Sequence, residues 1–421
     1  MKRRWNKLLL VVVVAASASI AALPTIAARY CRYRGEADLK RFQNQAALEW
    51  MTAAARYAPG DAETHFLLAR CHRRPGRFDD MERFLDRAAR LGCPAQRIER
   101  ERRLSIAQTG RVQTVAQYLS GMLMAPGDDG AEICASYVSG YCLSFDFQAA
   151  GSLLEAWSKD FENDPEPHFR TGDLWYAQNE WAKAVDCYRR CLALDAAHRK
   201  ARLSLAQCLM RRNEPAEAES QFREYLKADP DNLEAQTGLG TCLMTLGRLA
   251  DARKLFLQVE ARAPEQFEVR RRLGELELSC GRLEQALEWV LPLAEKWPED
   301  KIVCLVAAQA LQQTARADEA LKYWDAVRRA EESLSRLEKL TRAVRDDPAN
   351  ADLRYQIGMM LMRFRSREDG VGWLQSLLQY EPNHRGAHRA LADYYARIGD
   401  SELADRHRRV ADSASQVPRD R

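Results

Sequence analysis

Residues 230–264 read PDNLEAQTGLGTCLMTLGRLADARKLFLQVEARAP, and this stretch decides the fold. It begins at Pro230 and ends at Pro264, and it holds two apolar segments at helical spacing, separated by Leu246-Gly247-Arg248. Proline suits the first turn of a helix but not its interior, and glycine readily ends a helix in the left-handed conformation. The stretch therefore predicts a helix, a short turn and a second helix.

The same pattern recurs every 34 residues. Pro298 follows Pro264 at this spacing, and Pro348 and Pro382 repeat it further along the chain. When these units are aligned, small residues fill two columns twelve residues apart. The first column holds Gly172, Ala206, Gly240, Gly274, Ala308, Gly358 and Ala392, and the second holds Ala184, Ala218, Ala252, Ala286, Ala320, Gly370 and Ala404. Small residues let paired helices approach closely, and because one pair cannot bury its apolar stripe alone, neighbouring pairs must stack.

In Leu239-Gly240, Ala252, Phe256 and Pro264 the sequence resembles the tetratricopeptide repeat family, and the resemblance covers residues 165–331 and 348–411. It implies an all-α fold, an α-solenoid of stacked antiparallel helix pairs that forms a tetratricopeptide-type superhelix. It also implies a protein that binds other proteins, because this family binds diverse protein partners.

The repeat pattern divides the chain into five segments. In the second segment, Ala47, Met51 and Ala54 match a second helix whose first helix would be the anchor itself. From the end of the third segment into the fourth, helical spacing continues without a breaker until Pro348, which predicts one long helix or two joined helices over 315–347. The segments are a basic N-tail with an anchor or signal (1–34), degenerate helical repeats (35–164), regular repeats (165–331), a connecting helix with C-terminal repeats (332–411) and a disordered tail (412–421).

An uncharged run from Leu8 to Ala28 lies near the N-terminus. As a helix, a run of this length spans about 30 Å, close to the thickness of a bilayer core. Arg29, Arg32 and Arg34 follow it, so we expect one transmembrane helix at residues 8–28. Ala16-Ser17-Ala18 leaves cleavage as an exported signal open. Flanking Lys and Arg set the orientation of a membrane helix, but here basic residues lie at both ends of the run, so they nearly balance. We favour an extracytoplasmic body, and a cytoplasmic body is the alternative.

Charge and motifs exclude several classes of function. Lys and Arg number 64 and Asp and Glu 60, and this balance gives no argument for nucleic acid as a partner. The sequence has no GxxxxGK[ST], HExxH, GxSxG or CxxC motif, so we predict no catalytic residue, no cofactor and no metal site. His384 and His388 have the spacing of a metal-binding pair, but their position in and after a loop favours ordinary surface histidines.

In the family that the chain resembles, the first helices of the repeats line a concave groove. The corresponding positions here are Arg70, Arg73, Arg74, Asp173, Tyr176, Gln207, Arg211, Thr241, Arg271, Arg272, Gln309, Gln312, Tyr355, Arg363, Arg389 and Arg397. Many arginines suit an acidic or extended protein or peptide segment as ligand. Glu268, Glu275 and Asp393 lie among them, so an ordinary solvated surface stays open as the alternative.

Together these patterns predict a membrane-anchored protein-interaction scaffold. The alternative is a non-catalytic structural subunit of a larger envelope enzyme or secretion complex.

Overall fold

A computed structural model describes residues 24–144, 146–264, 266–347, 349–364, 367–397 and 401–413. Within these ranges every regular element is a helix, as predicted. The chain forms two compact units, divided between Gly140 and Tyr141. The predicted boundary at residues 331 and 332 lies inside one long helix.

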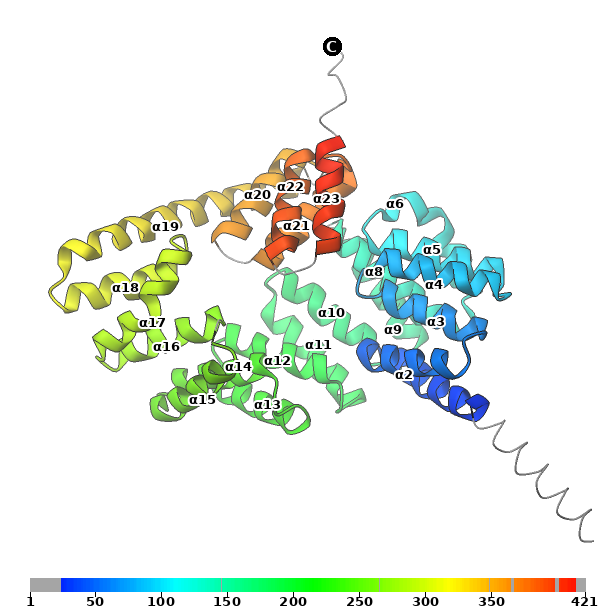
Figure 1. Cartoon of the computed structure of the whole chain (residues 1–421), viewed down its shortest axis with the longest axis horizontal. Helices are drawn as coiled ribbons and strands as arrows, with labels where there is room; N and C mark the ends of the chain where they lie inside the picture. Colours follow the sequence, from blue (N-terminus) through cyan, green and yellow to red (C-terminus); the bar gives the residue numbers. More distant parts are fainter. Residues whose placement is uncertain are drawn as a thin grey trace, which may run out of the picture. The chain divides into compact units, whose positions relative to one another are not determined.

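Unit 1 starts with helical residues 24–40 and continues through a run of mostly short-linked helices (Figure 1). These are α2 (Asn44–Tyr57), α3 (Ala62–Arg73), α4 (Phe78–Arg90), α5 (Ala95–Gln108), α6 (Val112–Val115), α7 (Leu119–Met124) and α8 (Gly130–Leu143), which runs across the division between the units. A short 3-10 turn, Gly127–Asp129, comes directly before α8.

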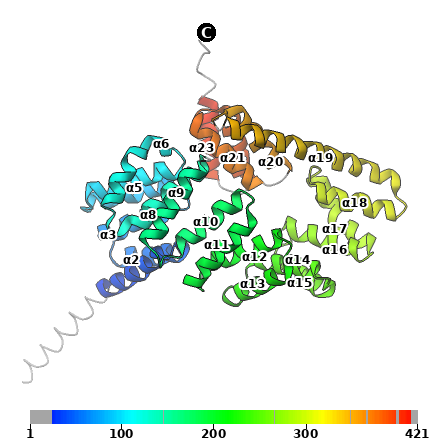
Figure 2. The ribbon, with the colours of Figure 1, turned by 180° about the vertical axis from the view of Figure 1, so that it is seen from behind.

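Unit 2 is a succession of paired helices, which can be followed from α10 to α18 in Figures 1 and 2. Its helices are α9 (Phe147–Asp160), α10 (Glu166–Ala177), α11 (Trp181–Leu194), α12 (Arg199–Arg211), α13 (Pro215–Ala228), α14 (Leu233–Thr245), α15 (Leu249–Arg262), α16 (Phe267–Ser279), α17 (Leu283–Lys296), α18 (Lys301–Gln313), α19 (Ala317–Asp346), α20 (Ala351–Phe364), α21 (Arg367–Tyr380), α22 (Arg385–Arg397) and α23 (Ser401–Ser413). The Tyr380 hydroxyl donates to the Ser144 carbonyl oxygen at 3.3 Å, so the array turns back toward its first segment.

The two small-residue columns mark where paired helices touch. Gly240 on α14 is buried, and a Cβ added there would lie 2.4 Å from the ring of Phe256 on α15. A Cβ added at Gly274 would likewise clash with the side chain of Val290. A Cβ added at Gly35, in the first described helix, would clash with the side chain of Met51 on α2. The predicted register is therefore confirmed, and residues 24–40 form the first helix of the first pair.

Where the structure describes the turn within a regular helix pair, the turn lies at one fixed register position with positive φ. Gly247 and Gly281 adopt this conformation, as expected from their sequence context. Asn179, Asn213 and Ala315 have positive φ seven positions after the first-column residues Gly172, Ala206 and Ala308. In unit 1, Phe42, Gly76 and Gly110 have positive φ between consecutive helices. A positive φ costs a residue with a side chain about 1–2 kcal/mol, so the pairing of the helices imposes the turn even where glycine is missing.

The starts of six described first helices are capped at another fixed position. The side chain two residues after Pro230 is Asn232, which accepts a hydrogen bond from the Ala235 amide at 2.9 Å. Side chains that cap in the same way are Asp61, His198, Asp300, Asn350 and His384. Such caps satisfy amides that the first turn of a helix leaves unpaired, each contributing about 1 kcal/mol.

The connecting segment after α18 is one continuous helix, α19, of 30 residues. Its first half packs with α18 through Ala320, Tyr323 and Val327. Its second half contributes Leu337 and Val344 to a separate cluster with α20. Of the two predictions for this segment, the single long helix is confirmed.

The predicted transmembrane segment lies mostly outside the described residues, because these begin at residue 24. Among the described residues, no helix combines the length and the apolar character needed to cross a membrane.

We expect Gly240→Ala and Gly240→Leu to lower stability by about 1–3 kcal/mol, because the fully buried Phe256 ring cannot make room for a Cβ. The control is Gly372→Ala in α21, where a Cβ would meet nothing within 4 Å and removing a helical glycine adds about 0.5–1 kcal/mol. Urea unfolding measures both effects, and a shift of the same sign in the two variants would contradict the register.

Candidate functional site

The three predicted binding arginines of unit 1 lie inside the unit. Arg73 is 1% exposed, and its Nε donates to Glu101 Oε1 on α5 at 2.7 Å. Its Nη2 also pairs with Glu132 on α8. Arg70 contacts Glu101 at 3.1 Å, and Arg74 contacts Glu132 at 2.6 Å. These guanidinium groups therefore join α3 to α5 and α8 and do not face a partner.

Charges in this cluster are closely balanced. Burial alone would raise the pKa of Glu132, but Arg74, Arg73 and Arg70 outweigh this effect and hold its pKa well below the usual value. Asp129 adds a further carboxylate, 2.9 Å from Arg70 and 3.0 Å from Arg100. A buried ion pair of this kind is costly to break, because the remaining charge stays desolvated.

Two predicted arginines on α16 are neutralised by their own helix. Arg271 is 8% exposed and contacts Glu268 at 2.6 Å and Glu275 at 3.2 Å. Arg272 contacts the same two carboxylates at 2.9 Å and 3.0 Å. Two positive and two negative charges thus cancel on one helix face, so little attraction for a distant acidic ligand remains there.

Other predicted residues of the central repeats stay at the surface. Arg211, at the end of α12, is exposed and forms no ion pair with any described residue. The Gln207 amide donates to Glu234 on the next first helix at 2.7 Å. Half-buried Tyr176 packs edge-on against Trp181, and Gln309 is half-buried while Gln312 is exposed.

A row of apolar residues lies beside these polar positions, and of its members only Tyr176 is among the residues predicted from the sequence. Tyr176, Met210, Met244 and Leu278 each come four residues after the first small column, and all are half-buried against the core or its edge. The 34-residue register contains this signal, since the position can be tabulated like the two small columns. Methionine is flexible and polarisable, and it is common on surfaces that accept varied partners.

The predicted residues of the C-terminal repeats have different surroundings. Tyr355 packs against His384, with ring centroids 4.8 Å apart. Arg363 pairs with Glu299 at 3.1 Å, whereas Arg389 and Arg397 on α22 are exposed and form no ion pair with any described residue. Arg211, Arg389 and Arg397 are therefore the predicted arginines whose charge is left for a ligand.

Asp173, on α10, has an unusual environment for an exposed carboxylate. Desolvation by the surrounding protein raises the pKa of Asp173 to about 6. The Tyr188 hydroxyl donates a hydrogen bond to this carboxylate at 2.8 Å and opposes the shift. Water reaches the side chain, and with a pKa of about 6 the carboxylate is mostly ionised at neutral pH.

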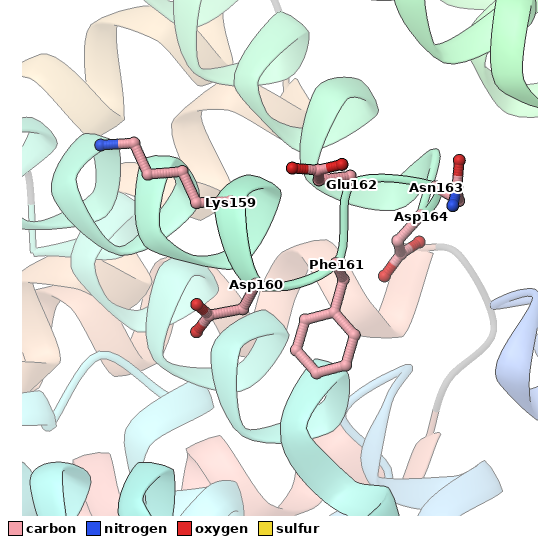
Figure 3. Close-up of a pocket in the computed structure, with 6 residues that line it drawn as sticks. All are labelled: Lys159, Asp160, Phe161, Glu162, Asn163 and Asp164. Atoms are coloured by element: carbon pink, nitrogen blue, oxygen red, sulfur yellow. The ribbon is translucent and has the colours of Figure 1, made fainter.

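A shallow hollow lies at the turn between α9 and α10. It is lined by one continuous segment, Lys159–Asp164, whose side chains point in different directions in Figure 3. The Asp164 carboxylate already accepts hydrogen bonds from Trp157 Nε1 and the Glu166 amide, each at 3.0 Å. The hollow therefore does not bring together groups for catalysis.

The candidate histidines have structural partners. His384 caps α22, and His388 is buried with its Nε2 2.8 Å from the Pro382 carbonyl oxygen. His388 Nδ1 lies 2.8 Å from His407 Nδ1. Within the described ranges, no group of three or more His, Cys, Asp or Glu residues is placed to hold a metal ion.

We expect Glu132→Gln to destabilise unit 1 by about 3–5 kcal/mol at neutral pH, because it removes a counter-charge from buried guanidinium groups. A lowered folded-state pKa gives stability that is present above the unfolded value of about 4.3 and is lost as pH falls through the folded value. The difference from the parent chain should therefore be largest at neutral pH and shrink only in strong acid. Thermal unfolding against pH measures it, and Glu82→Gln, at an exposed ion pair with Arg102, is the control.

The central repeats match a known protein family. Residues 169–232, 209–266 and 237–301 match the family described as Tetratricopeptide repeat. No curated protein sequence matches the chain significantly. Among solved structures, yeast Tom70 is similar at 14% identity and a TM-score of 0.36, with 93% of this chain and 92% of that chain covered. PilW, described as a type IV pilus biogenesis factor, is similar at 18% identity and a TM-score of 0.41, over 46% and 89%.

A third solved structure, YrrB, described as a TPR protein with an unusual peptide-binding site, is similar at 19% identity and a TM-score of 0.29, over 56% of this chain and 95% of that chain. Similarity at these levels carries no conclusion about what this chain binds. The family match and the helix pairs together establish that residues 169–301 are an array of tetratricopeptide repeats.

Proposed function

We propose that the chain is a membrane-anchored scaffold that binds a protein partner along the first helices of unit 2. This proposal rests on a row of half-buried apolar residues that follows consecutive repeats beside exposed polar side chains. The row consists of Tyr176, Met210, Met244 and Leu278. A partner laid across these helices would gain many modest contacts, each repeat adding one apolar and one polar position.

Acidic residues on the partner are the second part of the proposal. Arg211, Arg389 and Arg397 support it, because each is exposed and without an ion pair among the described residues. Arg271 and Arg272 support it less, since Glu268 and Glu275 neutralise them. The charges would mainly speed the encounter, and the apolar row would supply most of the residence time.

Membrane attachment through residues 8–28 is the third part. It is supported by the length of the uncharged run and by the arginines that follow it. We place the body on the extracytoplasmic side; export after signal cleavage and a cytoplasmic body are the alternatives. Attachment would confine the scaffold to the membrane surface and so raise its effective concentration for partners there.

The second candidate function is a non-catalytic structural subunit of a larger envelope enzyme or secretion complex. The cluster of Arg73, Glu101 and Glu132 favours a rigid body, as such a role requires. Purification from membranes distinguishes the two functions, because a subunit stays with its complex in fixed stoichiometry whereas a scaffold exchanges its partner.

We expect Arg211→Glu with Arg397→Glu to slow association with the partner and to change dissociation little, because exposed charges steer encounter. The matched control is Lys254→Glu, an exposed charge on α15, a second helix. Association rates against salt measure the effect, since screening shortens the reach of these charges to about 8 Å near physiological ionic strength. Rates that are independent of salt and equal in all three chains would refute an acidic partner.

We expect the full chain to resist alkaline carbonate extraction from membranes, and a chain lacking residues 1–23 to be released while still folded. Removing residues 1–34 should release it and also lower its melting temperature, because this cut takes away buried Ala28 and Cys31 and the Arg32–Asp61 ion pair at 2.8 Å. Intact-mass measurement is the check on processing: a mature chain without residues 8–28 would show a cleaved signal instead.

A further inference from the structure

The first described helix has two faces of opposite character. Ala28, Cys31, Gly35 and Leu39 are buried, with Gly35 directly against Met51 on α2. On the other side Ile26 is 60% exposed, Tyr30 54% and Tyr33 69%. The spacing of these three residues, four and then three positions apart, puts them on one helix face. We call this the Tyr30–Tyr33 face.

Basic residues surround the Tyr30–Tyr33 face. Arg29, Arg34 and Lys40 are exposed on the same helix, and none forms an ion pair with a described residue. The Arg34 guanidinium lies over the ring of Trp50, 5.5 Å from its centroid, and Tyr30 packs edge-on against the same ring at 6.0 Å. The acidic neighbour Glu36 is already paired with Arg32 at 3.4 Å.

Tyrosine, tryptophan and arginine side by side are typical of the boundary between a bilayer and water. Their rings sit at the level of the lipid headgroups, and basic side chains bind anionic phosphates there. The apolar run of residues 8–23 comes immediately before this helix in the sequence, so whatever membrane that run enters lies close by. A second copy of the chain is a poorer fit, because a two-fold pairing would bring like charges together.

We propose that the Tyr30–Tyr33 face lies against an anionic lipid surface, so that the first helix pair of unit 1 is itself a membrane-contacting element. Ile26, Tyr30 and Tyr33 would enter the headgroup layer, while Arg29, Arg34 and Lys40 would bind lipid phosphates. The inference rests on the proposed anchoring, which supplies the neighbouring bilayer, but it concerns a surface that extends beyond the anchor, because Tyr30, Tyr33 and the basic residues follow residue 28.

Site-directed spin labelling of the full chain in lipid nanodiscs tests the proposal. One label is placed by Tyr33→Cys, and the control label by Gln113→Cys at an exposed position of α6, which lies away from α2 within unit 1 in both Figures 1 and 2. The unsubstituted chain, labelled in parallel, gives the background from native cysteines. In discs containing phosphatidylglycerol, the label at 33 should lose collisions with a water-soluble relaxing agent, and the label at 113 should not.

A second measurement uses binding to phosphatidylglycerol vesicles by the chain that lacks residues 1–23 but keeps the Tyr30–Tyr33 face. Arg29→Gln and Arg34→Gln should each weaken binding about fivefold, as expected for one basic side chain near an anionic surface. Tyr30→Ser with Tyr33→Ser should weaken it further. Lys254→Glu, on unit 2, should leave it unchanged.

The outcomes separate this surface from the anchor. A chain that stays in the discs while its label at 33 is as accessible as that at 113 would overturn the surface and leave the anchor intact. A chain that leaves the discs would overturn the anchor, and vesicle binding that depends on Tyr30 and Tyr33 would then still support the surface. Protection of residue 33 without lipid, rising with protein concentration, would mean that a second copy covers the face and would overturn the proposal.

Discussion

The close approach of two helices at a position that holds only glycine or alanine is the contact on which the array of regular repeats depends. Where Gly240 meets Phe256, the backbones come near enough for an aromatic ring to fill the space that a Cβ would take. That distance dictates the length of the turn and therefore the positive φ at Gly247 and at its counterparts. Because each pair is built alike, the next pair can stack on it in the same way, and the core grows as a line and not as a sphere.

Most of this architecture could be predicted because its causes are local and repeated. The helix pairs could be predicted from the small columns and the turn glycines. The long helix α19 could be predicted from the uninterrupted helical spacing before Pro348. The burial of Arg70 and Arg73 could not be found in the same way, because Arg73 is 28 residues from Glu101 and 59 from Glu132. Register places a side chain on a helix, but only the packing of unit 1 decides that another helix covers it.

The same limit applies to the candidate binding surface. Register placed Arg211, Arg271 and Arg397 on first helices, yet their charges differ in effect, because Glu268 and Glu275 lie within one turn of Arg271 and no described carboxylate pairs with the other two. Spacing of three and four residues along a helix could have revealed the neutralisation on α16. Met210 and Met244 also recur at one position of the 34-residue register, but methionine beside a core is as typical of core packing as of a binding surface.

The continuous helix α19 has a consequence for how the chain comes apart. In an ordinary repeat array, units join through side-chain interfaces, so the ends can unfold while the middle stays folded. Here one helix belongs to both the cluster around Tyr323 and the cluster around Leu337, and melting either cluster frees part of a backbone that the other needs. Local unfolding of the last repeats should therefore either include the whole of α19 or stop before this helix. Helix α19 is thus the boundary of a segment that unfolds cooperatively.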